Sequence, residues 1–145
     1  MGPNGEIKKI ALLTGGGDCS GLNAVIRAAV RTAILKYGYE VIGYIGGYYG
    51  LFKDEYIPLT LSAITGIFHQ GGTILKMSNR DNLFNYRTTD SDGNIVNLDV
   101  SDIAIENIKK NGVDALVIIG GDGTLTSARD FARKGINVVG IPKTI

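Results

Sequence analysis

The sequence has very little cysteine and histidine, and this scarcity narrows the chemistry open to it. Its 145 residues include one cysteine, Cys19, and one histidine, His69. A lone cysteine cannot form an intramolecular disulfide, which indicates a reducing compartment. The same counts exclude a metal site built from clusters of cysteine and histidine. A catalytic nucleophile–histidine–acid system would have to use His69, and no Gly-x-Ser-x-Gly motif accompanies it, so a structural role is favoured.

Long apolar runs and an excess of either charge are also absent. No segment reaches the roughly 18–20 consecutive apolar residues of a membrane span, and the N-terminus has no apolar signal-peptide core. Lysine and arginine total 15 against 14 aspartate and glutamate, for a formal net charge of +1. This balance argues against a protein that coats nucleic acid or an acidic membrane. We expect a soluble, cytoplasmic protein with no nucleic-acid or membrane partner.

Glycine, in contrast, is abundant. The chain has 21 glycines, about twice the ordinary usage of roughly 7%. They cluster at residues 15–17, 46–47, 71–72 and 120–121. Clustered glycine indicates tight turns or a close approach of the backbone to a ligand.

Apolar runs typical of buried strands alternate with segments of helical periodicity. Strands are predicted at residues 10–13, 41–45, 115–119 and 138–141, and helices at 22–36, from 99 or 101 to about 110, and from about 124 to 134. Less regular parts are a loop over 48–60 with a strand near 56–57, a brief helix from 62 to 67 or 69, a strand at 73–75 and a hairpin at Asp92-Gly93. The alternation predicts an α/β fold with a doubly wound, mostly parallel sheet and helices on both faces. No domain boundary is evident within residues 1–145.

Two of the predicted strands run into glycine turns that contain an aspartate. The turns are residues 15–18, Gly-Gly-Gly-Asp, and residues 120–124, Gly-Gly-Asp-Gly-Thr. Glycine lets backbone N–H groups point at phosphate oxygens, and the helix after each turn adds the positive end of its dipole. A single turn of this kind is explained equally well by the glycine that any turn from a strand into a helix needs. Two turns on one sheet, both with aspartate, favour a polyphosphate ligand, although neither matches the Walker A or G-x-G-x-x-G pattern.

Three charged residues accompany these turns. Asp122 beside a phosphate needs a cation between the two, and Mg²⁺ supplies one through one or two carboxylates plus phosphate oxygens and water. The alternative is that Asp122 caps a helix starting near Thr124. Arg80 could grip a phosphate with two hydrogen bonds, although its spacing alone favours a solvated loop arginine. Lys143 could place a point charge at the end of the last strand, or lie exposed there.

These motifs together resemble the phosphofructokinase family. The resemblance runs in the family's order over nearly the whole chain. It is specific in the first and last motifs, while Gly-Gly-Asp-Gly-Thr also occurs in NAD kinases and lipid kinases. The matching segments are residues 13–27, 47–51, 71–75, 120–124 and 142–145.

The resemblance implies a Rossmann-like N-terminal domain that helps to transfer a phosphoryl group from Mg-ATP to the 1-hydroxyl of fructose 6-phosphate in glycolysis, within a homotetramer. It implies catalytic roles for Gly17, Arg80 and Thr144, and a magnesium ligand in Asp122. The residues that it places at the nucleotide and its phosphates are Gly16, Gly17, Tyr48, Arg80, Asp81, Gly121, Asp122, Gly123, Thr124 and Lys143. Two departures from the family pattern are an extra residue between Leu75 and Arg80 and an insertion over residues 85–98.

The phosphoryl donor is a separate question. Gly123 leaves room for a nucleotide, whereas pyrophosphate-dependent relatives carry aspartate there, whose carboxylate would crowd and repel ATP. Lys143 resembles the pyrophosphate branch, although some ATP-using members share it. The balance favours ATP, with pyrophosphate as the alternative.

The family's catalytic base is the aspartate that follows Thr-Ile in the last motif, here the position after Ile145. The sugar-phosphate domain would lie beyond it. We therefore expect residues 1–145 to be the nucleotide-binding N-terminal part of a longer enzyme, with little or no kinase activity alone. Two other hypotheses stay open: another kinase with the Gly-Gly-Asp-Gly-Thr motif, such as an NAD kinase, and a non-catalytic phosphate-sensing module.

Overall fold

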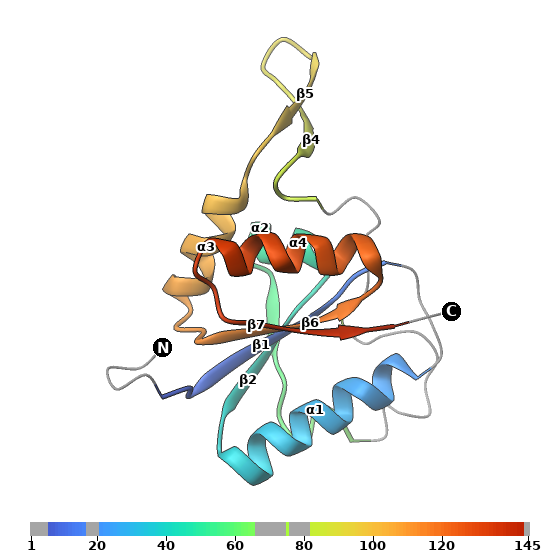
Figure 1. The fold of residues 1–145 in the computed structure, drawn as a ribbon, viewed down its shortest axis with the longest axis vertical. Helices are drawn as coiled ribbons and strands as arrows, with labels where there is room; N and C mark the ends of the chain where they lie inside the picture. The colour runs from blue at the N-terminus through green and yellow to red at the C-terminus, as the bar shows by residue number, and fades with distance from the viewer. Residues whose placement is uncertain (1–5, 17–20, 66–74, 76–81, 144–145) are drawn as a thin grey trace.

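A five-stranded sheet forms the centre of the molecule in the computed structural model, which describes residues 6–16, 21–65, 75 and 82–143 (Figure 1). The strand order is β3-β2-β1-β6-β7. β1 pairs in parallel with β2 and with β6, β6 pairs in parallel with β7, and β3 is antiparallel to β2. The predicted mostly parallel sheet is confirmed. Its strands are β1 (Lys9–Thr14), β2 (Glu40–Tyr44), β3 (Tyr56–Pro58), β6 (Ala115–Gly120) and β7 (Val138–Pro142).

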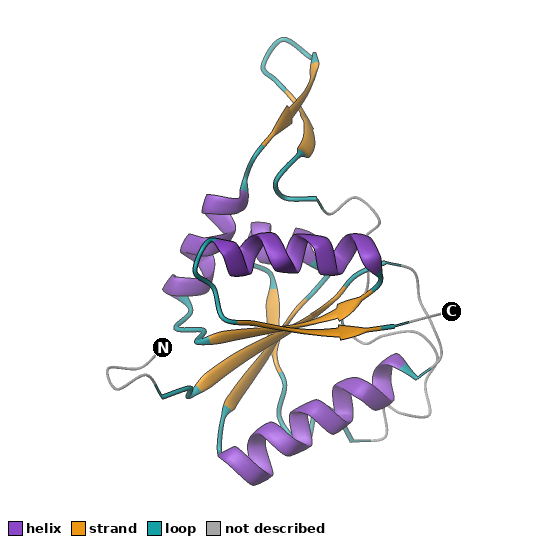
Figure 2. Cartoon of the chain, in the orientation of Figure 1, coloured by secondary structure: helices purple, strands orange, loops and turns teal. Residues whose placement is uncertain are grey.

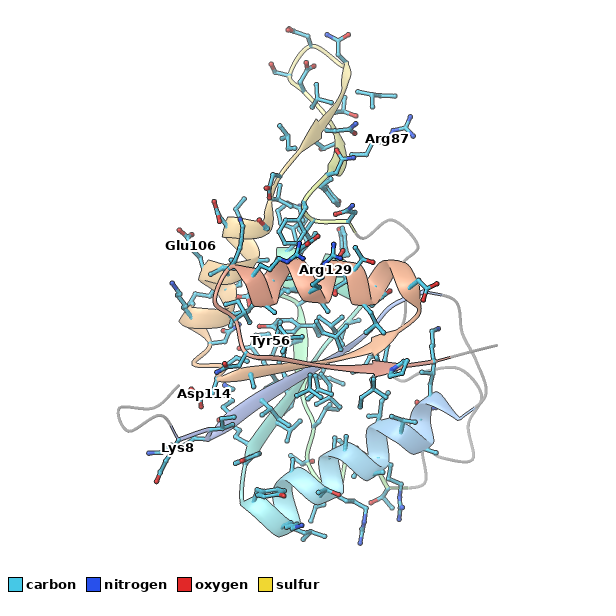
Figure 3. The ribbon with its side chains drawn as sticks, in the orientation of Figure 1. Lys8, Tyr56, Arg87, Glu106, Asp114 and Arg129 are labelled. Carbon is cyan, nitrogen blue, oxygen red and sulfur yellow. The ribbon has the colours of Figure 1, made fainter. Side chains whose placement is uncertain are left out.

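β1 lies in the middle of the sheet because both of its faces are apolar. Leu12 belongs to one buried cluster and Leu13 to the cluster on the opposite face, since successive side chains of a strand alternate. The start of β1 is fixed to the start of β6, because a carboxylate oxygen of Asp114 accepts backbone hydrogen bonds from Lys8 and Lys9 at 2.8 and 3.0 Å (Figure 3). The two strands therefore run in register to their carboxyl ends.

One face of the sheet is covered by α1 (Leu22–Tyr37) (Figure 2). Its buried residues include Leu22, Ile26 and Val30, which follow the spacing that predicts this helix. Gly38 ends the helix with a φ of 68°, and its backbone N–H donates hydrogen bonds to the carbonyls of Ala33 and Ile34. The prediction of a helix closed by this glycine is confirmed.

The opposite face carries α2 (Tyr48–Lys53), α3 (Ser101–Lys110) and α4 (Asp122–Arg133) (Figure 2). Phe131 of α4 is fully buried among them, against the rings of Tyr48 and Phe84. α1 and α4 thus lie on opposite faces, which confirms the doubly wound arrangement.

A separate hairpin projects from the body on the α3 side (Figure 1). It consists of β4 (Tyr86–Thr89) and β5 (Ile95–Leu98), paired antiparallel. Its turn has Gly93 at a φ of 83°, and a side-chain oxygen of Asp90 accepts the N–H groups of Asp92 and Asn94. The hairpin predicted from Asp92-Gly93 is confirmed, and it occupies most of the segment that looked like an insertion.

Some of the predictions for the segment between β2 and β4 are wrong. The expected loop over 48–60 is wrong in its first half, because Tyr48–Lys53 is the helix α2, while the strand near 56–57 is confirmed as β3. Residues 61–65 form turns rather than the start of a helix. The remainder of that prediction and most of the predicted strand at 73–75 lie outside the described residues. No helix in the described part of the chain has the length and apolar character needed to cross a membrane.

Candidate functional site

The carboxyl ends of three neighbouring parallel strands form one edge of the sheet. Thr14 at the end of β1 pairs with Ile119, and Gly120 at the end of β6 pairs with Pro142. The backbone hydrogen bonds continue beyond the strands: the N–H of Gly15 donates to the carbonyl of Ile119 at 2.9 Å, and that of Lys143 donates to the carbonyl of Gly120 at 3.0 Å. The described parts of both glycine turns and the last motif therefore lie side by side. This edge is where ligands bind in open parallel sheets.

The two glycine turns contact each other through Thr124, in the first turn of α4. Its side chain occupies the space that a Cβ would need on either Gly15 or Gly120. Neither glycine has a positive φ, so packing rather than backbone conformation requires the absence of a side chain at these positions. The structure thus brings together the β1 and β6 turns that the sequence singled out.

The side chain of Lys143, at the end of β7, extends to the glycine turn that follows β1. A Cβ placed on Gly16, which has a φ of 80°, would lie 3.5 Å from Cε and 3.6 Å from Nζ of this lysine. An ammonium group is therefore held beside backbone that can present its N–H groups to an anion. Lys143 is only partly exposed.

Asp122 is the first residue of α4, and its side chain is exposed. The residue at the cap position is Gly121, which has no side chain to cap the helix. The alternative role, a cap for a helix starting near Thr124, is therefore not what this aspartate performs. A carboxylate at the positive end of a helix dipole is electrostatically favoured there. Within the described residues no group of three or more histidine, cysteine, aspartate or glutamate side chains could hold a metal, so a cation here would take most of its ligands from elsewhere.

The other two glycines of the β6 turn face open space. A Cβ on Gly121 or Gly123 would meet no atom of the described residues within 4 Å. This contrasts with Gly15 and Gly120, where the protein itself fills the space. None of the residues that the structure describes requires Gly123 to lack a side chain, so among them the space there is available to a ligand.

Tyr48 lies beneath this edge rather than on its surface. Its side chain is 1% exposed, and its hydroxyl donates a 2.7 Å hydrogen bond to the carbonyl of Thr124. Its ring stacks on Phe131 with the centroids 5.8 Å apart. No local sequence pattern predicts this bond, because the two residues are 76 positions apart.

Thr14 was also missed by the sequence reasoning. It is fully buried at the end of β1, and its Oγ1 is the one buried side-chain polar atom found without a hydrogen-bond partner among the described residues. Such unpaired groups are rare in folded proteins because each costs free energy. A hydroxyl in an otherwise apolar strand was the available signal.

Several residues expected at the site lie outside the described part of the chain. They are Gly17, Arg80, Asp81 and Thr144. The structure therefore brings together Gly16, Tyr48, Thr124, Lys143 and the glycines and aspartate of the β6 turn.

Comparison with known proteins decides the family. The sequence profile described as "Phosphofructokinase" matches residues 9–145. The chain belongs to the phosphofructokinase family. Membership in this family accounts for the order of the motifs along the chain. It also favours the phosphofructokinase hypothesis over that of an NAD kinase.

Curated relatives agree with this assignment. The chain is 69% identical over 139 residues to "ATP-dependent 6-phosphofructokinase 2" of Clostridium perfringens, a match that covers 96% of this chain and 38% of that protein. It is 46% identical over 139 residues to the protein of the same name in Streptomyces coelicolor, covering 94% of this chain and 37% of the relative. The chain thus spans well under half the length of the curated relatives it matches.

Solved structures of the family share the fold. The phosphofructokinase of Pichia pastoris in the T-state superposes with a TM-score of 0.79 at 31% identity, over 96% of this chain and 15% of that one. A pyrophosphate-dependent phosphofructokinase from Nitrosospira multiformis has a TM-score of 0.76 at 15% identity, covering 94% of this chain and 34% of the other. The second likeness shows the fold alone.

Proposed function

We propose that this chain is the nucleotide-binding N-terminal part of an ATP-dependent 6-phosphofructokinase. The complete enzyme would transfer a phosphoryl group from Mg-ATP to the 1-hydroxyl of fructose 6-phosphate, in the cytoplasm and as a homotetramer. The names of its relatives support this activity. Because the chain spans only 38% of the Clostridium relative, we propose that the sugar-phosphate site requires sequence outside residues 1–145 and that this part alone has little or no kinase activity.

The observation that carries the proposal is the contact between the two glycine turns through Thr124. It sets the backbone of the β1 turn beside the positive end of α4, with the Lys143 ammonium close to Gly16. An array of backbone N–H groups, a helix N-terminus and a lysine is suited to a chain of phosphates. In phosphoryl transfer such groups act by positioning the donor and neutralising its charge.

Asp122 is proposed as the magnesium ligand. Its exposed carboxylate at the start of α4 fits a cation that binds one or two carboxylates and keeps its other positions for phosphate oxygens and water. When bound, Mg²⁺ would supply charge neutralisation and orientation of the donor phosphates. Asp122 itself would fix where that charge sits relative to the glycine turns.

ATP is proposed as the donor because of the open space at Gly123. Pyrophosphate remains the second candidate, since Lys143 lies close to the first glycine turn and resembles the lysine of the pyrophosphate branch. Titration calorimetry with Mg-ATP and with Mg-pyrophosphate tests the choice. We expect tighter binding of Mg-ATP, and tighter binding of Mg-pyrophosphate would reverse the assignment.

Two variants sharpen this experiment. Gly123→Asp should keep the chain folded, because its side chain enters open space, and should weaken Mg-ATP far more than Mg-pyrophosphate. Asp122→Asn should remove the Mg²⁺ dependence of ATP binding while leaving the helix start intact. Asp130→Asn, also on α4 but away from the turns, is the matched control. An Mg²⁺-independent anion affinity in the wild-type chain would instead support a phosphate-sensing module.

A further inference from the structure

The side chain of Thr124 fills two spaces at once. An ideal Cβ on Gly15 would lie 2.7 Å from Cγ2 of Thr124 and closer still to its Oγ1. An ideal Cβ on Gly120 would lie 2.5 Å from the same Cγ2 and 2.6 Å from Cβ of Thr124. Real Cβ atoms essentially never approach other atoms this closely. The small threonine side chain is therefore in van der Waals contact with the backbone of both turns.

Thr124 is itself held in place from the core. Its carbonyl accepts the 2.7 Å hydrogen bond from the hydroxyl of Tyr48. The Tyr48 ring is buried and stacks on Phe131, two helical turns further along α4. Two points on α4 are thus fixed against one buried aromatic side chain, so the first turn of this helix has little freedom to shift.

We propose that Thr124 and Tyr48 are positioning residues that set the separation of the two glycine turns. Thr124 acts as a spacer between Gly15 and Gly120, and Tyr48 holds that spacer through its carbonyl. The proposal rests on the proposed function, because the turns are taken as the phosphate-binding backbone. It assigns the side chain of Thr124 a role in packing between the two turns.

The spacing matters because the N–H groups of both turns must reach one ligand. Preorganised donors stabilise an anion only when their positions match its oxygens, and small displacements cost much of the effect. A spacer that fits both glycines maintains this match before the ligand arrives. Enlarging Gly15 or Gly120 should therefore weaken binding of Mg-ATP, and a smaller residue at position 124 should restore it.

The first experiment is a double-mutant cycle on this chain. Gly15→Ala should weaken Mg-ATP binding by about tenfold with Thr124 present, but by less than about threefold in the Thr124→Ala background. The reason is geometric: Thr124→Ala removes Oγ1 and Cγ2, and the remaining Cβ lies 3.1 Å from a Cβ on Gly15, a tight but adjustable contact. Gly15→Ala alone could fail to fold. In that case the rescue is measured as the recovery of folded protein that binds Mg-ATP when Thr124→Ala is added.

Gly120→Ala provides the matched contrast. Its Cβ would lie 2.6 Å from Cβ of residue 124, so Thr124→Ala should not rescue it, whereas Thr124→Gly should. This difference between two adjacent glycines separates a spacer from a general loss of packing. Equal behaviour of Gly15→Ala and Gly120→Ala in the Thr124→Ala background would overturn the proposal.

The second experiment concerns Tyr48. Tyr48→Phe keeps the ring and removes the hydroxyl that donates to Thr124, and should raise the Mg-ATP dissociation constant by roughly fivefold. Tyr44→Phe is the control, since Tyr44 is equally buried but its hydroxyl accepts from Asn111 instead. It should lower the melting temperature without changing affinity. The same loss of affinity in both variants would identify a merely structural role for Tyr48.

The outcomes also separate this inference from the proposed function. A wild-type chain that binds neither Mg-ATP nor Mg-pyrophosphate overturns both. A chain that binds a donor but shows no rescue of Gly15→Ala by Thr124→Ala overturns the spacer alone.

Discussion

The ammonium group of Lys143 lies over Gly16, with its Nζ 3.6 Å from where a Cβ of that glycine would be. The contact joins the end of β7 to the end of β1, although β6 lies between them in the sheet. Lys143→Met keeps the apolar stem and removes the charge. We expect a rise of about tenfold in the dissociation constants of Mg-ATP and Mg-pyrophosphate, with the larger effect on pyrophosphate, because a smaller anion has fewer other contacts.

Calorimetry at two salt concentrations checks this prediction. The difference between wild type and Lys143→Met should shrink at high salt, since a partly exposed charge is screened. Lys36→Met, in the last turn of α1, serves as the control and should have no effect. Unchanged affinity in Lys143→Met would remove this lysine from the site.

A second prediction concerns the buried hydroxyl of Thr14. Its Oγ1 has no hydrogen-bond partner among the described residues, so burying it costs free energy without return. Thr14→Val replaces the hydroxyl by a methyl group of similar size. We expect the free energy of unfolding to rise by about 1 kcal/mol, which shifts the melting temperature upward by roughly 2–4 °C. Thermal unfolding followed by circular dichroism measures this, and a lower melting temperature would mean that the hydroxyl is paired in solution.

A third prediction concerns acid stability at the junction of α2 and α3. Burial alone would raise the pKa of Asp54, but hydrogen bonds from Lys110 and Asn111, at 2.6 Å each, outweigh it and lower the pKa below its ordinary value of 3.8. A carboxyl group whose pKa is lower in the folded state stabilises the protein above its ordinary pKa, and this contribution is lost as the pH falls through the folded value.

Asp54→Asn tests this directly. Asparagine suits the left-handed backbone at position 54, where φ is 62°, so the variant changes charge with little strain. The loss at neutral pH should not exceed about 1 kcal/mol, because the side chain of Lys110 is 61% exposed. The difference in stability from wild type should shrink below about pH 4. A difference that stays constant down to pH 2 would contradict the assignment.

Much of the fold was predictable because its signals are local. The apolar spacing from Leu22 and the glycine at 38 define α1, and Asp92-Gly93 marks the hairpin. The short helix α2 was not predictable, since Tyr48–Lys53 contains a glycine and has no helix-capping side chain. It forms because Gly46 and Gly47, at φ values of 82° and 65°, turn the chain and bring Tyr48 against Phe131.

The candidate site divides in the same way. The carboxyl ends of parallel strands lie at a common edge, so the predicted parallel sheet places the β1 and β6 turns and Lys143 at that edge. That β1, β6 and β7 are neighbours was not predicted and comes from the structure. The steric reason for Gly15 and Gly120 was not predictable, because it depends on one threonine side chain that reaches both. The buried position of Tyr48 was likewise not predictable, because its contacts with Thr124 and Phe131 join residues far apart in the sequence.

The central place of β1 has a consequence for how the chain is made. Its neighbour on one side, β2, follows within a few dozen residues, but its neighbour on the other, β6, begins only at Ala115. During synthesis the backbone N–H and C=O groups on the β6 side of β1 therefore stay unpaired until about a hundred further residues have been added, and contacts so distant along the chain slow folding. Until Ala115–Gly120 leaves the ribosome, we expect the nascent chain to depend on chaperones to shield that edge of β1.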